Sequence, residues 1–210
     1  MVNKLVQKIK SSRLVWKYSG LTYRWSVLAT RGKYLTLNEY LQNSVEKIKS
    51  LSIDIQQKKV LEFGTGIGGN LLCIAKEINK GVGVDVNCLY TKRANRLKNF
   101  TIPIKDKFDV VFSLNVFERI PHDIARKLVI QLFRLVSQEG ILVLFFLGER
   151  ARSTGFVNRL GEDAYSFWSL DELKSLFNSN EFKGSGININ KIPIMPGEDN
   201  NNAYLVKLSL

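Results

Sequence analysis

The residues best suited to chemistry lie in a glycine-rich turn at positions 64–69. Glycines at 64, 66, 68 and 69 follow the apolar run 60–63, and the stretch 71–78 has helical spacing. A strand, a glycine turn and a helix in this order let a ligand approach the backbone closely. The run 81–84 reads as a second strand and ends at Asp85. A carboxylate there accepts hydrogen bonds from the two hydroxyls of a ribose. The sequence therefore predicts a site for a nucleoside-containing cofactor.

The glycine pattern alone does not identify that cofactor. Gly64, Gly66 and Gly69 satisfy the G-x-G-x-x-G spacing of dinucleotide enzymes, which is a weak match by itself. Glu62 stands two residues before the first glycine, where its charge would oppose a pyrophosphate and suit a cationic amino-acid group. An NAD(P)-binding oxidoreductase remains an alternative, as does a non-catalytic module that has kept the fold.

Three blocks of sequence, at residues 60–68, 83–87 and 108–121, belong together. In this order they resemble a class I S-adenosylmethionine-dependent methyltransferase, and the resemblance covers roughly residues 58–210. The nearest branch is the small-molecule type related to quinone-biosynthesis methyltransferases. The resemblance implies S-adenosylmethionine as cofactor and these cofactor-binding residues: Glu62, Gly64, Thr65, Gly66, Gly68, Asp85, Val86 and Asn115.

Two side chains after the third block are candidates for catalysis, His122 and Glu118. An imidazole titrates near neutral pH and could remove a proton from the acceptor. Either residue could instead have a structural role. For His122, the alternative is a surface histidine at a helix N-terminus. A sulfonium methyl is already electrophilic, so alignment supplies much of the rate and a base matters only for an acceptor that must lose a proton. Relatives often have a histidine directly after the glutamate, where this chain has Arg119.

The segment 86–107 is shorter than in relatives. Its 22 residues must hold a basic helix, expected at about 88–98, and a short third strand, expected at about 100–104. Relatives place an acidic residue after that strand to bind the adenine amino group. Asn99 and Asp106 are the candidates here, and neither is in convincing register. Backbone groups and apolar contacts could recognise adenine instead.

The acceptor is only broadly constrained. The sequence Asn-Val-Phe-Glu at 115–118 differs from the Asn-Pro-Pro-aromatic signature of enzymes that methylate exocyclic amines in DNA. A small-molecule, lipid or glycan acceptor is therefore favoured, with an RNA methyltransferase as the alternative. Acceptor contacts are expected from the N-terminal helices and from residues 148–168, which include Arg150, Arg152, Tyr165 and Trp168.

Charge is concentrated near the N-terminus. Residues 1–59 carry twelve basic and three acidic side chains, a net +9 of the chain's +12, together with six Trp and Tyr residues. Such a pattern suits an anionic surface, either lipid headgroups, nucleic acid or a phosphorylated substrate. Peripheral contact with an anionic membrane is favoured over nucleic acid. The alternative is a basic helical lid over the active site.

The pattern as a whole predicts an α/β fold, a doubly wound, mostly parallel Rossmann-like sheet that ends in an antiparallel β-hairpin. Residues 1–57 form a helical N-terminal extension and residues 58–210 the cofactor-binding domain. Expected strands are 58–63, 81–86, 108–114, 141–146, 187–194 and 203–210, and expected helices are 3–18, 36–50, 69–79, 123–136 and 170–178, the last opened by a capping box at Ser169 and Glu172.

Other features set limits on the class of protein. The longest apolar run, 141–147, is too short to span a bilayer. Two cysteines, Cys73 and Cys88, with no Cys/His cluster, predict no metal site and a reducing, cytoplasmic setting. Cys73 and Cys88 are expected to serve core packing. The sequence predicts neither the acceptor nor the oligomeric state.

Overall fold

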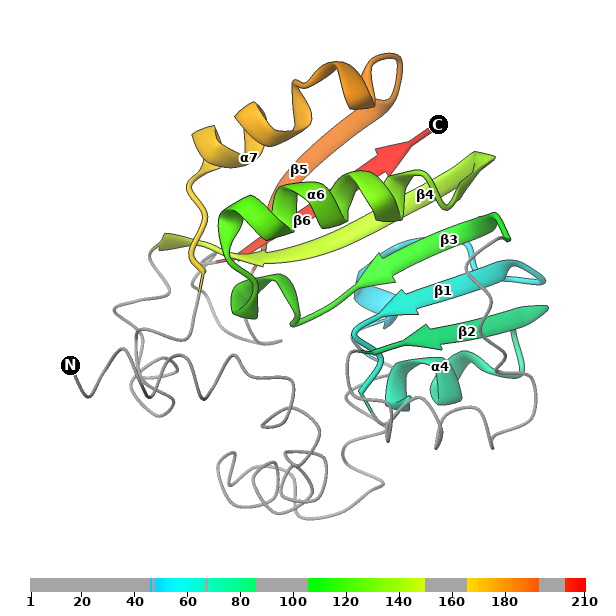
Figure 1. Cartoon of the computed structure of the whole chain (residues 1–210). Helices are drawn as coiled ribbons and strands as arrows, with labels where there is room; N and C mark the ends of the chain where they lie inside the picture. Colours follow the sequence, from blue (N-terminus) through cyan, green and yellow to red (C-terminus); the bar gives the residue numbers. More distant parts are fainter. Residues whose placement is uncertain (1–45, 47, 67, 86–105, 150–165, 193–202) are drawn as a thin grey trace, which may run out of the picture.

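The computed structural model describes residues 46, 48–66, 68–85, 106–149, 166–192 and 203–210. These residues form one six-stranded sheet with helices on both faces (Figure 1). The predicted helices 3–18 and 88–98, the predicted strand 100–104 and most of the predicted helix 36–50 lie outside the described residues.

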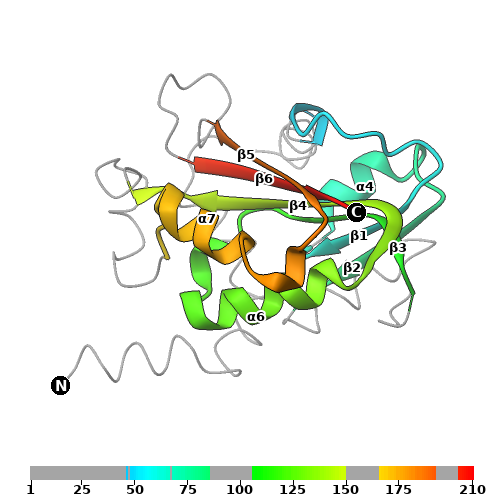
Figure 2. The same cartoon turned by 90° about the horizontal axis from the view of Figure 1, so that it is seen from above.

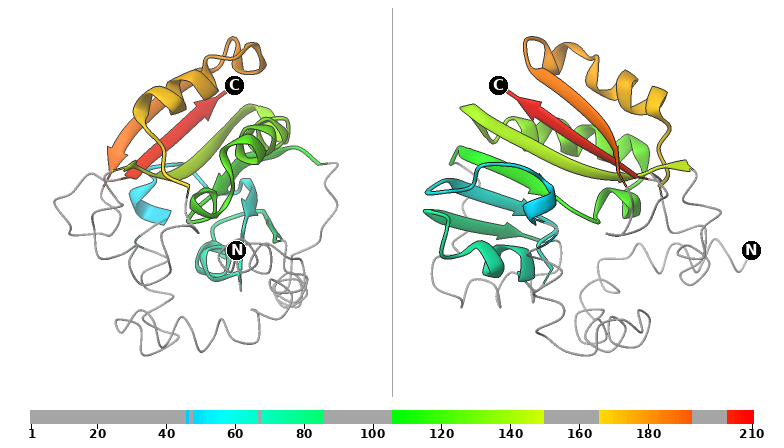
Figure 3. Two further views of the ribbon diagram at one scale, coloured as in Figure 1. Left: turned by 60° about the vertical axis from the view of Figure 1, so that its left-hand side comes forward. Right: turned by 180° about the vertical axis from the view of Figure 1, so that it is seen from behind.

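The sheet has the order β2-β1-β3-β4-β6-β5. Strands β2, β1, β3 and β4 run parallel, and β6 is antiparallel to both β4 and β5. Figure 3 shows β2 and β5 at the two outer edges of the sheet. The prediction of a mostly parallel sheet closed by an antiparallel hairpin is confirmed. The strands are β1 (Lys59–Phe63), β2 (Lys80–Val84), β3 (Phe108–Ser113), β4 (Val136–Leu147), β5 (Gly186–Ile192) and β6 (Ala203–Ser209).

Neighbouring residues of the central strands are buried on opposite faces, as a sheet covered on both sides requires. Leu61 belongs to the core cluster that includes residues of α6 (His122–Phe133) and α7 (Leu170–Phe177). Val60 belongs to the cluster on the other face, with residues of α4 (Gly69–Ile74). Figure 2 shows this layering, with α6 and α7 on one side of the sheet and α4 on the other. Two short 3₁₀ turns, η1 (Phe117–Arg119) and η4 (Asn180–Phe182), precede α6 and β5.

Two predicted boundaries were wrong. The helix predicted at 69–79 ends at Ile74. The strand predicted at 141–146 already begins at Val136, so Glu139 and Gly140 lie inside β4. The register between β3 and β4 shifts there, and a Cβ at Gly140 would come within 2.9 Å of the Asp109 carbonyl oxygen. The backbone of β4 therefore bulges closely against β3, which sequence spacing does not show.

The predicted capping box is confirmed at the start of α7. The Ser169 Oγ accepts from the backbone N–H of Glu172 at 3.1 Å, and Glu172 Oε2 accepts from the backbone N–H of Ser169 at 2.8 Å. None of the described helices combines the length and apolar character needed to cross a membrane. The described part of the chain also brings together no set of three or more His, Cys, Asp or Glu side chains that could hold a metal ion.

Candidate functional site

The predicted site residues gather where the parallel strands end. The glycine turn follows β1, Asp85 follows β2 and Asn115 follows β3. Because β1 pairs in parallel with both neighbours, their carboxyl ends meet at one edge of the sheet (Figure 1). Ligands of open α/β sheets bind outside this edge. The fold thus unites three sequence blocks that lie far apart along the chain.

The turn itself is held in a left-handed conformation. The φ angles of Gly64, Gly66 and Gly68 are 77°, 54° and 85°, values that L side chains rarely adopt. The backbone N–H of Gly64 donates to the Val84 carbonyl at 2.7 Å, and that of Gly68 donates to the Thr65 carbonyl at 2.9 Å. The turn is therefore fixed to the end of β2 before it enters α4.

Two glycines of the turn differ in what surrounds them. A Cβ at Gly64 would lie 2.1 Å from a methyl carbon of Val116, so this glycine lets the segment after β3 pack against the turn. A Cβ at Gly66 would meet no described atom within 4 Å. Gly66 therefore borders space that no described residue fills, whereas Gly64 serves internal packing.

Glu62 supports the turn from within the protein. Its side chain is only 1% exposed. Oε2 accepts from the Thr65 hydroxyl at 2.8 Å, and Oε1 accepts from the Asn70 side-chain amide at 2.6 Å. The carboxylate thus joins β1, the turn and α4. Its predicted contact with the cofactor stays a prediction, and the role of Asn70 could not be read from the sequence because it depends on the position of Glu62.

The charge of Glu62 is also felt by Cys73 on α4. Burial, with a smaller contribution from Glu62, raises the pKa of the Cys73 thiol above its ordinary value. The thiol therefore stays protonated at neutral pH and is a poor nucleophile. Cys73 is only partly buried, and its expected role in core packing stays a prediction.

Asp85 connects the second strand to the turn. Its Oδ2 accepts from the backbone N–H of Gly66 at 2.9 Å. The carboxylate therefore lies beside the open space at Gly66, where the sequence places the ribose-binding acid. Thr65 and Gly68 shape the same turn, and the predicted site residue Val86 lies outside the described residues.

Asn115 has an unusual backbone conformation. Its φ is 58°, in the left-handed region that few residues other than glycine adopt. Such strain persists where surrounding structure enforces it and is concentrated at functional sites. Here Val116 packs against Gly64 and Leu114 is buried, so both neighbours fix Asn115 at the edge of the sheet.

His122 lies in a cluster that the sequence did not predict. The imidazole stacks on the Trp168 indole with ring centroids 4.0 Å apart, and its Nδ1 lies 3.5 Å from Oε1 of Glu172. The pKa of Glu172 is lowered mainly by hydrogen bonds from Ser169. The nearby His122 lowers it further by a smaller amount. The capping carboxylate is therefore ionised at neutral pH and faces the imidazole.

The segment before α7 brings this cluster to the ligand-binding edge. The backbone N–H of Trp168 donates to the Leu147 carbonyl at 2.8 Å, at the carboxyl end of β4. Ser166 donates through its N–H to the Glu118 carbonyl and through its hydroxyl to the Ile120 carbonyl, both at 2.6 Å. The predicted acceptor residue Trp168 is only 3% exposed, and Glu118 is likewise buried in η1. His122 is thus the more accessible of the two catalytic candidates, with 41% of its side chain exposed.

Comparison with known families agrees with this geometry. A family model described as a methyltransferase domain matches residues 36–184, more than half of the chain. The chain belongs to this methyltransferase family. The predicted class, an S-adenosylmethionine-dependent methyltransferase, is confirmed, while its quinone-biosynthesis branch stays a prediction.

Solved structures place the methyltransferase among class I folds. Magnesium protoporphyrin IX methyltransferase from Synechocystis PCC 6803 with bound S-adenosylmethionine is 16% identical, with a TM-score of 0.62 over 94% of each chain. The plantazolicin methyltransferase, in complex with a triazolic desmethylPZN analog and S-adenosylhomocysteine, is 14% identical, with a TM-score of 0.63 over 100% of this chain and 99% of that one. A possible histamine N-methyltransferase from Thermotoga maritima is 15% identical, with a TM-score of 0.59 over 93% and 97%. A search of curated proteins finds no match.

One candidate for adenine recognition lies in the wrong place in this methyltransferase. Asp106 forms an ion pair with Lys80 at 2.7 Å, and this contact lowers the pKa of the carboxyl group. Lys80 begins β2 and Asp106 precedes β3, so the pair lies at the amino ends of the parallel strands. That edge is opposite the glycine turn. The other candidate, Asn99, and the expected acceptor residues Arg150, Arg152 and Tyr165 lie outside the described residues.

Proposed function

We propose that this methyltransferase binds S-adenosylmethionine at the glycine turn and methylates a small-molecule, lipid or glycan acceptor that reaches the edge near His122. The observation that carries the proposal is the open space at Gly66, bordered by the Asp85 carboxylate. The alternatives are an RNA acceptor and an NAD(P)-dependent reaction at the same turn.

The residues of the turn fit this cofactor. Asp85 offers a carboxylate to the ribose hydroxyls, and the absence of a side chain at Gly66 lets the nucleoside lie against the backbone. Asn115, held at the end of β3, would face the methionine end, and Val86 would continue the contact from Asp85. The buried Glu62 places a negative charge beneath the turn, which disfavours a pyrophosphate.

When bound, S-adenosylmethionine supplies an electrophilic methyl group. The protein therefore has to align the acceptor and, where the acceptor is protonated, remove its proton. We assign proton removal to His122, because Trp168 and Glu172 fix its ring while part of the imidazole stays exposed. Glu118 is the second candidate, buried within η1.

The structural comparisons and the charge of the N-terminal segment bear on the nature of the acceptor. The solved structures named above include a magnesium protoporphyrin IX methyltransferase and a plantazolicin methyltransferase, which supports a small-molecule acceptor. We extend the proposal to the basic, aromatic N-terminal segment, which would contact an anionic membrane surface or an anionic group of the acceptor. Basic residues near an anionic membrane contribute about 1 kcal/mol each. A cytoplasmic protein with peripheral membrane contact would sediment with anionic vesicles at low salt and release at high salt.

Calorimetry tests the proposed cofactor directly. S-adenosylmethionine and S-adenosylhomocysteine should both bind the 210-residue chain, and NAD(P) should not. A screen of methyl transfer into lipid, quinone, glycan and RNA extracts then identifies the acceptor class. Binding of NAD(P) without binding of S-adenosylmethionine would refute the proposed function.

Asp85 should contribute strongly to cofactor affinity. Asp85→Ala is expected to weaken S-adenosylmethionine binding by about tenfold to a hundredfold, since hydrogen bonds to a charged group contribute roughly 1.5–3 kcal/mol each. It also removes the acceptor of the Gly66 N–H. Asp85→Asn keeps an acceptor for that N–H but lacks the charge, so it should retain more affinity than alanine. Unchanged calorimetric affinity in a folded Asp85→Ala protein would exclude this residue from the site.

A further inference from the structure

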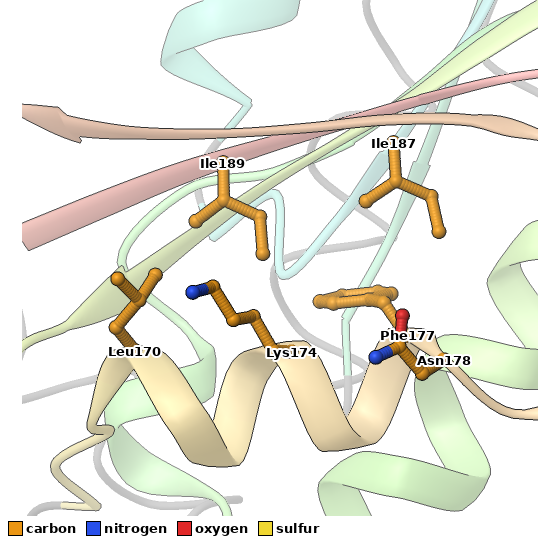
Figure 4. Close-up of a pocket in the computed structure, with 6 residues that line it drawn as sticks. All are labelled: Leu170, Lys174, Phe177, Asn178, Ile187 and Ile189. Atoms are coloured by element: carbon orange, nitrogen blue, oxygen red, sulfur yellow. The ribbon is translucent and has the colours of Figure 1, made fainter.

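A groove between α7 and β5 lies apart from the glycine turn. Its volume is about 440 Å³. Figure 4 shows side chains of α7 on one wall and two isoleucines of β5 on the other. Helical spacing brings the α7 residues to one face, and strand alternation brings the isoleucines together. The lining residues are Leu170, Lys174, Phe177, Asn178, Ile187 and Ile189.

The β5 wall of this groove is an edge of the sheet. Within the described part of the chain, β5 pairs only with β6. Five of its seven residues are exposed, and Ile187 keeps 38% of its surface accessible. An edge strand presents a row of backbone N–H and C=O groups that can pair with another strand. An exposed, alternating apolar edge of this kind is suited to strand addition.

The groove also carries positive charge. Lys174 extends from α7 toward β5 (Figure 4). Lys191 lies two residues after Ile189 on β5, so alternation places it on the same face as the isoleucines. No carboxylate is among the lining residues, and neither lysine has an ion pair with any described residue. The groove therefore combines apolar side chains with the basic group of Lys174, and Lys191 adds a second basic group further along the same face of β5.

We propose that this groove and the β5 edge bind an acidic, extended segment of a partner protein, which adds to the sheet as a strand beside β5. Alternate apolar side chains of that segment would lie beside Ile187 and Ile189 on the same face, and an Asp or Glu in the same row would lie near Lys191 and Lys174. Cross-strand pairs of these kinds stabilise neighbouring strands. A second copy of this chain fits less well, because it would bring its own lysines and a net charge of +12. RNA or a membrane would use the lysines but not the backbone edge.

The test uses the whole 210-residue chain and a displayed library of random ten-residue peptides. Selected peptides are expected to alternate apolar residues, to contain Asp or Glu and to lack proline. Fluorescence anisotropy should show that Lys174→Glu and Ile187→Asp each weaken binding at least about tenfold. N-methylation of alternate peptide amides should have a similar effect, because it removes the backbone hydrogen bonds of an added strand.

Matched variants at the far end of the sheet separate the groove from general effects of charge and hydrophobicity. Lys76→Glu makes the same charge change, and Leu72→Asp alters a residue that is also 38% exposed. Both should bind the peptides within about twofold of the unmodified protein. Circular dichroism checks that each variant is folded. If Ile187→Asp does not fold, Lys174→Glu alone provides the test of the groove.

Several results would overturn the proposal. The selection could enrich no peptides, or it could enrich peptides that lack acidic residues. Lys174→Glu and Lys76→Glu could also weaken peptide binding equally. Tolerance of N-methylation would also overturn it, since an added strand needs its backbone amides. A dimer in sedimentation that Ile187→Asp abolishes would assign the edge to a second copy instead. An RNA oligonucleotide that Lys174→Glu no longer binds, with no peptide bound, would assign the lysines to nucleic acid.

Discussion

Gly66→Val should weaken S-adenosylmethionine binding by about a hundredfold or more, which corresponds to at least about 2.8 kcal/mol. A Cβ at this position meets no described atom within 4 Å, so the added side chain would enter the space proposed for the nucleoside. The valine also has to adopt a φ of 54°, which costs about 1–2 kcal/mol for an L residue. The fold should therefore persist with reduced stability while binding is lost. Calorimetry and denaturant unfolding measure the two effects separately.

Gly184 offers a matched control for the backbone strain. It has a φ of 88°, a Cβ there would also meet no described atom within 4 Å, and it lies in the turn before β5. Gly184→Val should lose comparable stability and keep its affinity for S-adenosylmethionine. Equal affinities in the two variants would show that the space at Gly66 does not hold the cofactor. Gly64→Val should differ from both and fail to fold, because its side chain would overlap Val116.

The glycine turn was predictable because its signals are local. Glycines at φ values that other residues avoid, an apolar strand before them and a helical pattern after them all lie within 20 residues. The alternation of strands and helices then determines which ends of the strands meet. The prediction that Asp85 lies beside the turn follows from this topology, and the hydrogen bond from Gly66 agrees with it.

Contacts between distant segments could not be predicted in the same way. The bulge in β4 depends on how closely Gly140 approaches β3, which leaves no mark in the spacing of apolar residues. Asp106 is a candidate for adenine recognition by sequence alone. In the fold it forms an ion pair with Lys80, at the edge of the sheet opposite the glycine turn. The position of Trp168 over His122 depends on the path of the chain into α7, which follows from backbone bonds to η1 and β4.

That arrangement leads to the second large effect, expected at His122. His122→Phe should lower kcat for an acceptor that must lose a proton by about a hundredfold or more, the usual contribution of a general base. Phenylalanine keeps an aromatic ring to stack on Trp168 but has no nitrogen to take the proton. The acid limb of the pH–rate profile should disappear in the variant, while the affinity for S-adenosylmethionine stays within about twofold, because the glycine turn is unchanged. Both are measured with the acceptor that the methyl-transfer screen identifies.

Neighbouring substitutions distinguish a base from a structural histidine. Glu172→Gln removes the carboxylate 3.5 Å from Nδ1, so it should lower kcat by a smaller factor than His122→Phe, as expected of a positioning residue. Asp123→Asn changes a charge in the same first turn of α6 and should leave kcat unaltered, because no described contact joins Asp123 to the imidazole. Glu118→Gln tests the buried carboxylate in η1. If His122→Phe retains full turnover and Glu118→Gln loses it, proton removal belongs to Glu118, and the stacked histidine only joins α6 to α7.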